Sequence, residues 1–419
     1  MKKWWVPFLL LLPLLVPAER ADAAICTLDT VPAATLLLPY FEVDLNHPNG
    51  KTTLMAIVNA GAEARLAHVV TWTDLGVPTL AFDIYLTGYD AQSLNLRDLL
   101  TGNLPQTADT IHDPGNRISP RGRFSQDVTF PDCEGLLPPA PRSEVFLSHL
   151  RGAHTGAGSP LFNGYCSGVA FGDGIARGYV TVDVARRCSY LSPLDAGYFS
   201  SAGEEPVVAY DNVLYGDFMY LDPQNNLSEG NALVAIEAAP EGQFGSGAPT
   251  FYHRFVHDSG ADRREPLPDR WASRYFSGGP FSGGTELVVW REVPEPAQPF
   301  PCGHLPSWYP LNTSKIVTFD EQEHPVVPFF CPFECPPPPL PTPFSAAANR
   351  VLVGGTALPV PYNFGWQYFD METDLFPQQT QLLQSWMGSI HRSLGHFSVG
   401  TPATALDDGC VRPDFLVGF

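Results

Sequence analysis

Proline is the residue that most restricts the folds open to this chain. The 419 residues include 43 prolines and 37 glycines. Proline lacks a backbone donor and clashes with the preceding turn of a helix, so long regular helices are excluded over most of the sequence. Thr, Val, Tyr and Phe fall between the prolines in short runs, which favours strands joined by turns. The sequence therefore predicts a mainly β fold.

Runs of strand length recur along the whole chain, and their spacing is typical of antiparallel β-sandwich sheets. They lie at 52–59, 65–72, 79–86, 178–190, 212–222, 232–238, 250–256, 285–293 and 364–372. Two or more antiparallel β-sandwich-like units follow from this pattern, with short helices and a Cys/Pro-rich C-terminal segment. At more than 300 residues, single cores stop growing and chains divide into domains. We expect a β-sandwich at 24–138, a second β domain at 139–300 and a Cys/Pro-rich β region at 301–419.

Four segments have other patterns. Ser93 or Asn95 is placed to cap a short helical turn that ends at Leu100. Residues 267–276 carry Trp271 and Tyr275 at helical spacing after an early proline, which predicts a short helix. Residues 381–394 fit either a helix or a strand followed by a turn. The run CPFECPPPPLPTP, which contains Cys331 and Cys335, predicts polyproline II at the surface.

The first 23 residues have the pattern of an export signal. Lys2 and Lys3 precede an apolar run from Trp4 to Val16, and Ala21-Asp22-Ala23 is a small-x-small cleavage site. The run has 13 residues, whereas a membrane-spanning helix needs about 20. We expect cleavage before Ala24 and a mature protein that is secreted, periplasmic or at the cell surface. No later apolar stretch predicts a transmembrane helix.

The charge balance excludes one class of partner. The chain has 24 Lys and Arg against 44 Asp and Glu. Cleavage removes three basic and two acidic residues, which leaves a mature net charge near −21. An excess of that size repels phosphate backbones, so we expect no nucleic acid partner.

The eight cysteines predict four disulfides, because an even count in an exported chain is typical of a disulfide framework. They are Cys26, Cys133, Cys166, Cys188, Cys302, Cys331, Cys335 and Cys410. Proximity along the chain favours the pair Cys166 and Cys188. A zinc site built from Cys302, His304, Cys331 and Cys335 is the alternative, but thiols in an oxidising compartment are normally consumed as disulfides.

Residues 54–100 resemble the immunoglobulin-like or fibronectin-like modules of bacterial exported proteins. Val58-Asn59 ends a strand, Ala60-Gly61 forms a small-residue turn, and Trp72 is the aromatic residue of the next strand. The resemblance implies a β-sandwich and, by itself, no activity.

Signatures of catalysis are sparse. Neither Gly164–Gly168 nor Gly395–Gly400 matches the Gly-x-Ser-x-Gly elbow, and no His-Glu-x-x-His occurs. The densest charge cluster holds Asp262 and Glu265, which could act as the acid and base of a glycosidase. The arginines between them favour a structural salt-bridge network instead. His149 and His154 beside a glycine-rich loop are candidate ligands or bases, with solvated loop histidines as the alternative.

Two acidic loops have the oxygen-rich spacing of calcium sites, although turns use the same residues. One holds Asp44 and Asn46, and the other holds Asp222 and Asn226. Calcium is therefore the one possible cofactor, and none is otherwise expected. Sugar-stacking aromatics are candidates as well, with core packing as the alternative. These are Trp290, Trp308, Tyr309 and Trp366.

Taken together, these patterns predict an exported, disulfide-stapled, non-catalytic binding or structural protein with an unknown protein or glycan ligand at the cell surface. The alternatives are a secreted glycosidase-like hydrolase and a calcium-dependent adhesin.

Overall fold

The computed structural model describes most of the chain after the leader. The described residues are 30–106, 125–126, 128–199, 205–240, 249–252, 254–255, 262–278, 283–294, 297–326, 342–376, 379–381, 383–393 and 396–406. The expected leader, most of the polyproline segment, Cys26, Cys331, Cys335 and Cys410 lie outside these residues, as does the zinc alternative that uses two of those cysteines.

The fold is mainly β, as predicted, and its first half is built from two antiparallel sheets. A five-stranded sheet has the order β4-β3-β6-β1-β9, and a four-stranded sheet has the order β5-β2-β7-β8. Their strands are β1 (Thr35–Asp44), β2 (Thr52–Asn59), β3 (Arg65–Thr73), β4 (Pro78–Leu86), β5 (Ala91–Asn95), β6 (Ile175–Ala185), β7 (Leu214–Asp222), β8 (Leu227–Ala232) and β9 (Val234–Ile236). The sheets contact each other through β1 with β2 and β7, so the arrangement is sandwich-like.

Burial distinguishes the two sheets. β1 is buried at every position, whereas β7 alternates buried and exposed residues. Full burial means that both faces of β1 are covered, and alternation means that one face of β7 meets solvent. β1 therefore lies inside the molecule, where the second half of the chain packs against it.

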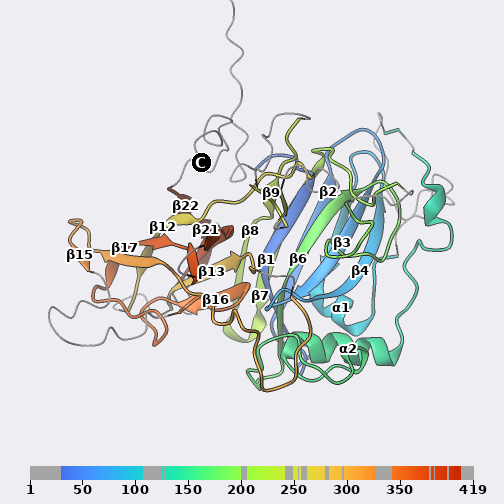
Figure 1. The fold of residues 1–419 in the computed structure, drawn as a ribbon. Coiled ribbons are helices and arrows are strands. Elements are labelled where there is room, and N and C mark those ends of the chain that lie inside the picture. The colour runs from blue at the N-terminus through green and yellow to red at the C-terminus, as the bar shows by residue number, and fades with distance from the viewer. Residues whose placement is uncertain are drawn as a thin grey trace, which may run out of the picture.

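The second half contributes two more antiparallel sheets. Their strand orders are β15-β14-β17-β12-β22 and β16-β13-β20-β21. The strands are β12 (Arg270–Phe276), β13 (Gly284–Arg291), β14 (Lys315–Phe319), β15 (Pro325–Val326), β16 (Ala348–Leu352), β17 (Phe364–Asp370), β20 (Ser385–Ser393), β21 (Phe397–Pro402) and β22 (Thr404–Ala405). Two short hairpins pair β10 (Pro249–Thr250) with β11 (Arg254–Phe255) and β18 (Thr373–Phe376) with β19 (Gln379–Gln381). In Figure 1 the blue-to-green strands of the first half lie beside the orange and red strands of the second.

The sheet that contains β13 packs on both of its faces. Trp290 of β13 has its ring centroid 6.0 Å from that of Tyr179 on β6 and 5.4 Å from that of Phe251. Side chains of alternate residues point to opposite faces of a strand, so Leu287 and Val289 face the other way, and both are fully buried. Most of the buried apolar residues of the two halves accordingly form one continuous core, and two smaller clusters are separate from it.

Helices are few in the described part of the chain. α1 (Leu96–Thr101) begins at Asn95, whose side chain accepts a hydrogen bond from the backbone of Arg97. This confirms one of the two predicted caps. α2 (Glu144–Thr155) is capped by Ser143. Both helices lie at one end of the first sandwich (Figure 1), and three short 3-10 turns complete the set at Pro131–Cys133, Pro160–Phe162 and Pro223–Asn225.

The helix predicted at 267–276 is wrong, because Arg270–Phe276 is strand β12. It pairs with β17 over seven residues, including Trp271 opposite Phe369. A spacing of four residues places side chains on one face of a helix, but it also places them on one face of a strand. Trp271 and Tyr275 are both buried on the strand's inner face. Residues 385–393 form a strand, which settles the ambiguity at 381–394.

The sheets extend across the domain boundaries expected from the sequence. β1 and β3 before residue 138 pair with β6 after it, and β13 before residue 300 pairs with β16 and β20 after it. In the described residues no helix has the length and apolar character needed to cross a membrane.

Candidate functional site

The charge cluster predicted around Asp262 is buried against the five-stranded sheet, on the face of β6 that carries Asp183 and Tyr179 and is turned toward the second half of the chain. Asp262 and Arg264 are fully buried. Asp262 Oδ1 lies 3.1 Å from Arg264 Nη1, and Asp183 Oδ1 lies 3.1 Å from Arg264 Nη2. The guanidinium also donates to the carbonyl of Ala209 at 3.2 Å. This is the salt-bridge network that the sequence favoured over catalysis.

Neighbouring strands extend this network across the sheet. Asp183 on β6 lies opposite Thr35 on β1 and His68 on β3, and His68 lies opposite Asp83 on β4. His68 Nδ1 is 2.7 Å from Asp83 Oδ1. Because all four side chains are buried, this row of polar residues crosses the sheet without reaching solvent.

Glu265 takes no part in the arginine network. Its side chain is buried, and its Oε2 has no hydrogen-bond partner in the structure. Burial, together with the nearby charge of Glu237, raises the pKa of Glu265 to about 8. Asp262 and Glu265 therefore lie in different surroundings, with the Asp262 carboxyl bound to a guanidinium and the Glu265 carboxyl without an ion pair to any of the residues that the structure describes.

The first calcium candidate is a loop held by a cation of the protein. Arg97 donates to the carbonyls of His47, Gly50 and Lys51 at 3.0, 3.0 and 2.7 Å, and also to that of Asp44. The Asp44 carboxylate accepts from the backbone of Asn46 at 2.9 Å. The guanidinium thus takes up carbonyl oxygens that a calcium ion would also use.

In the second calcium candidate, Asp222 caps a short turn. Its carboxylate accepts from the side-chain nitrogen of Asn225 at 2.7 Å, and Asn226 adopts a left-handed conformation with φ of 50°. Among the residues that the structure describes, no group of three or more His, Cys, Asp or Glu side chains is arranged to hold a metal ion.

The two disulfides described correct the pairing expected from the sequence. Cys133 is bonded to Cys188 and Cys166 to Cys302, so the predicted pair Cys166–Cys188 is wrong. The reason is β6, which lies between Cys166 and Cys188 and extends by about 3.3 Å per residue. A fully extended strand carries the two cysteines to opposite ends of the sheet.

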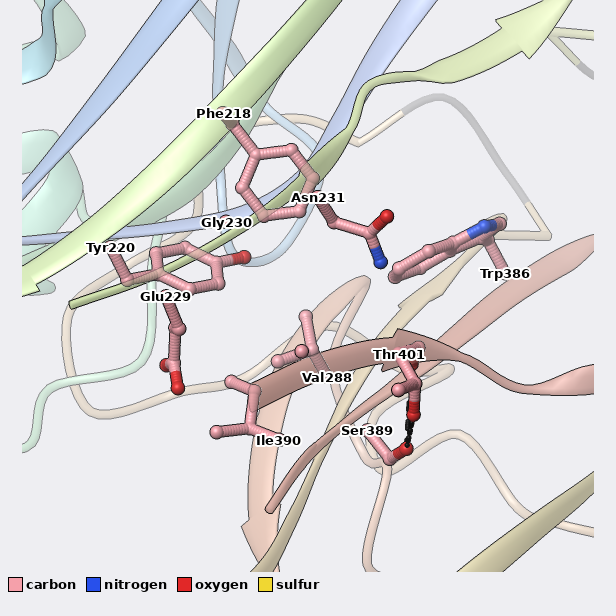
Figure 2. Close-up of a pocket in the computed structure, with 12 residues that line it drawn as sticks. Phe218, Tyr220, Glu229, Gly230, Asn231, Val288, Trp386, Ser389, Ile390 and Thr401 are labelled. Carbon is pink, nitrogen blue, oxygen red and sulfur yellow. Dashed lines mark hydrogen bonds between the residues drawn. The ribbon is translucent and has the colours of Figure 1, made fainter. Parts of the chain in front are cut away.

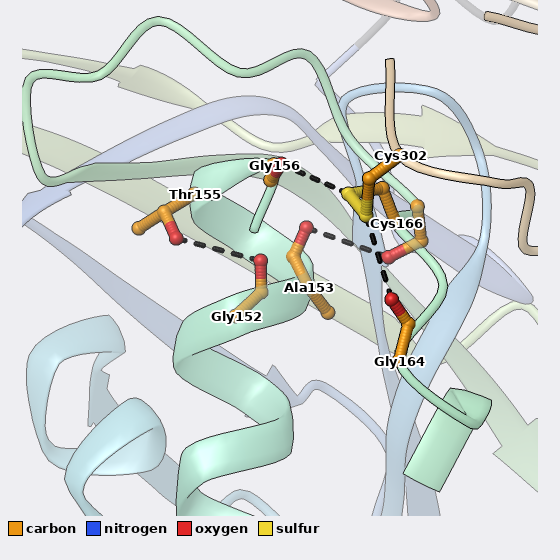
Figure 3. The surroundings of a disulfide bond; sticks show 8 residues. Gly152, Ala153, Thr155, Gly156, Gly164, Cys166 and Cys302 are labelled. Carbon is orange, nitrogen blue, oxygen red and sulfur yellow. Dashed lines mark hydrogen bonds between the residues drawn. A yellow bond between two sulfur atoms is a disulfide. The ribbon is translucent and has the colours of Figure 1, made fainter. Parts of the chain in front are cut away.

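Figure 3 shows the Cys166–Cys302 bond beside the C-terminal end of α2, where Cys166 Sγ lies 3.2 Å from the carbonyl oxygen of Gly156.

The helix α2 also carries both candidate histidines. His154 is buried between Thr79 Oγ1 at 2.8 Å and the carbonyl of Arg177 at 2.9 Å. Burial lowers the pKa of His154 to about 4. His149 contacts Ser159 Oγ and is buried as well.

The four candidate stacking aromatics separate into two groups. Trp290 and Trp308 are buried in the core, whereas Tyr309 and Trp366 are partly exposed. Trp366 stacks on Phe319 of the neighbouring strand, with ring centroids 4.1 Å apart and planes at 10°. Phe364, two residues before Trp366 on the same outer face, is 49% exposed.

A pocket that sequence reasoning missed lies where β8 and β21 meet. Phe218, Tyr220 and Trp386 form its aromatic walls, and Glu229 and Asn231 of β8 also line it (Figure 2). The walls come close together because three glycines line it. A Cβ on Gly388 would lie only 2.5 Å from the Trp386 ring.

Glu229 connects this pocket to an ionic cluster between the two halves of the chain. Its carboxylate lies 2.9 Å from Arg392 Nη2 and 3.4 Å from Arg350 Nη2, and it accepts from Ser398. Arg350 also lies 2.7 Å from Glu42 of β1. The sequence signal for this cluster was Glu42 within the apolar run of β1, whereas Glu229 stands in the polar strand LSEGNA, and nothing in the sequence indicated that the two meet.

In comparisons with known proteins, no family model, curated protein or solved structure matches the chain.

Proposed function

We propose that this chain is an exported, disulfide-bonded, non-catalytic binding protein of the cell surface or periplasm. The single observation that carries the proposal is the burial of its best catalytic candidates. Asp262 is 0% and Glu265 is 3% exposed. A glycosidase must bring both carboxyl groups into contact with a sugar ring and a water molecule. Here one carboxyl is bound to Arg264 and neither lies at the surface.

The ligand class that best fits the surface is a glycan, and the surface is the outer face of the sheet formed by β14, β17 and β12. Trp366 and Phe364 of β17, with Phe319 of β14, present aromatic rings on that face. Exposed aromatic rings with polar neighbours are a common basis of sugar binding, because the rings stack on the apolar faces of sugars. Arg274 lies opposite Trp366 on β12 and supplies donors for hydroxyl groups.

Affinity electrophoresis of the mature protein through gels that contain soluble polysaccharides tests this function. Trp366→Ala should lose retardation that the unchanged protein shows. Phe171→Ala is the matched control, because Phe171 is 58% exposed elsewhere on the molecule. Retardation that survives in Trp366→Ala would contradict the assignment of the surface.

The hydrolase alternative has its own test. The purified protein is incubated with polysaccharide and ester substrates, beside a Glu265→Gln variant whose circular dichroism shows that it folds. Turnover by the unchanged protein that the variant lacks would overturn the non-catalytic proposal, whatever the binding assay shows.

A further inference from the structure

The two halves of the chain meet along two edge strands. β8 is the last strand of one sheet and β21 is the last strand of another. Their backbones approach closely at Gly230 and Gly400, where a Cβ on Gly400 would lie 3.2 Å from the carbonyl oxygen of Gly230. The carboxylate cluster around Glu229 lies at this joint, and Glu229 also lines the pocket (Figure 2).

The charges in the cluster do not balance. Three carboxylates, Glu42, Glu229 and Glu286, share two guanidiniums. Arg350 lies 2.7 Å from Glu42, 2.6 Å from Glu286 and 3.4 Å from Glu229. Arg392 lies 2.9 Å from Glu229 and 3.2 Å from Glu286. With all three carboxylates ionised, the cluster has one negative charge more than its arginines neutralise.

The other polar groups that face the cluster do not remove this excess. Lys51 lies 3.5 Å from Glu42 but also 3.8 Å from Asp222, so its charge is divided with a further carboxylate. Its side chain is 36% exposed, in contrast to the 3% of Glu229. Arg177 of β6 lies opposite Glu42, but its guanidinium lies 2.6 Å from Asp173, so its charge is likewise divided with a further carboxylate. Ser398 of β21, Tyr220 of β7 and Tyr40 of β1 also face the cluster and bring no positive charge.

We propose that the excess is relieved by one proton held on Glu229, and that this proton makes the joint between β8 and β21 pH-sensitive. Glu229 is the natural carrier, because its side chain is the least exposed of the three carboxylates. When carboxylates share a buried site, one of them keeps its proton to a higher pH than usual.

The pKa of Glu229 agrees with the excess of one negative charge in the cluster. The pKa of Glu229 is raised to about 7, chiefly by burial and also by the charges of Glu286 and Glu42, while Arg350 and the hydrogen bond from Ser398 lower it. A folded-state pKa above the ordinary value means that the closed joint binds the proton more tightly than the open one. The closed joint is therefore most stable below about pH 5, and it opens more readily as the pH rises through 7. Loosening exposes the aromatic pocket between Phe218 and Trp386.

Hydrogen exchange measured by mass spectrometry on the full mature protein tests this inference. Peptides that cover 227–232 and 397–402 are followed at pH 5.5 and pH 8.0, after correction for the intrinsic exchange rates. A pKa of 7 in the closed joint and 4.5 in the open one predicts an opening constant at least tenfold larger at pH 8.0. Glu229→Gln should remove this difference, because glutamine does not titrate. Glu144→Gln, an exposed change on α2, should leave it intact.

A wild-type opening constant that does not change with pH would overturn the proposal, as would a Glu229→Gln variant that keeps the full change. Should that variant fail to fold, carbon-13 NMR titration of the Glu229 carboxyl in the unchanged protein decides the matter. A midpoint near 7 supports the proposal, and a midpoint below 5 contradicts it. Neither result bears on glycan binding at Trp366, so the two proposals fail separately.

Discussion

Asp262 and Arg264 form an ion pair with Oδ1 and Nη1 3.1 Å apart, and solvent reaches neither side chain. The same guanidinium pairs with Asp183 at 3.1 Å. One cation therefore compensates two buried carboxylates from distant parts of the chain, and burial without it would be strongly unfavourable.

Arg264→Met should lower the free energy of unfolding by about 3–5 kcal/mol, because it leaves Asp183 and Asp262 buried without a counter-charge. Urea denaturation followed by tryptophan fluorescence measures the loss. Arg186→Met is the control, since Arg186 forms an ion pair with Glu205 at 3.4 Å in which both side chains are largely exposed. That pair should contribute less than about 1 kcal/mol. Equal losses in the two variants would contradict a structural role for the buried network.

The sequence allowed the strands to be predicted wherever burial follows a local pattern. The run at 52–59 became β2 with the same bounds, and Asn95 proved to be a cap because the capping signal lies within a few residues of the helix. The error at Trp271 and Tyr275 has the opposite cause. Their spacing is compatible with a helix and with a strand, and only the pairing with β17 decides between them.

The site residues were harder to predict, because their contacts join segments far apart. Glu42 and Arg350 are 308 residues apart in sequence, and Cys166 and Cys302 are 136 apart. A single sequence records which strands carry a charged residue, but not which strands become neighbours. The pocket between Phe218 and Trp386 has no local signature, since it exists only where two sheets meet.

The disulfide Cys166–Cys302 should stabilise the protein as a link between its two halves. It closes a loop of 136 residues, against 55 for Cys133–Cys188. Replacing both Cys166 and Cys302 by Ala should lower the free energy of unfolding by about 2–5 kcal/mol, because the denatured chain regains the entropy of the open loop. Thermal unfolding by calorimetry measures the change. The Cys133→Ala, Cys188→Ala double variant should lose less, and a larger loss there would contradict the loop-length argument.

The loop that begins at Asp44 should depend on Arg97 for its conformation. Arg97→Met removes the donor to four carbonyls, three of them in partly buried bonds, and should lower the free energy of unfolding by about 2–3 kcal/mol, because charge-assisted bonds are each worth more than neutral ones. Chemical denaturation measures this. Adding EDTA to the unchanged protein should leave its melting temperature the same. A fall in melting temperature with EDTA that calcium reverses would instead establish a calcium site and favour the adhesin alternative.

Glu265 should destabilise the folded protein as the pH rises. Its folded pKa of about 8 lies above the ordinary value of 4.5, so its contribution to stability is complete below pH 4.5 and is lost as the pH rises through 8. Between pH 5 and pH 8 the unchanged protein should lose about 3–4 kcal/mol more than Glu265→Gln does. Urea denaturation at the two pH values measures this difference. If the free energy of unfolding falls equally in the two proteins, the pKa of Glu265 is not raised by folding and its carboxyl is ionised in the folded state.

Protonation of His154 should destabilise the folded protein as the pH falls, in contrast to the effect of Glu265 at high pH. Its folded pKa of about 4 lies below the ordinary value of 6.5, because the imidazole is buried between Thr79 and the carbonyl of Arg177. The unfolded state therefore binds the proton first as the pH falls. The contribution of the neutral His154 imidazole to the free energy of unfolding is complete above pH 6.5 and is lost as the pH falls through 4.

Unfolding free energies measured from pH 7 to pH 4 should consequently fall by about 3 kcal/mol on account of this residue alone. His154→Gln should be less stable at pH 7, because it loses the packing of the ring, but its stability should fall less steeply with acid. His304→Gln, a change at an exposed histidine, should keep the slope of the unchanged protein. If His154→Gln and His304→Gln show the same slope, the imidazole of His154 gains its proton in the folded state as readily as in the unfolded chain. The burial argument for that residue would then be wrong.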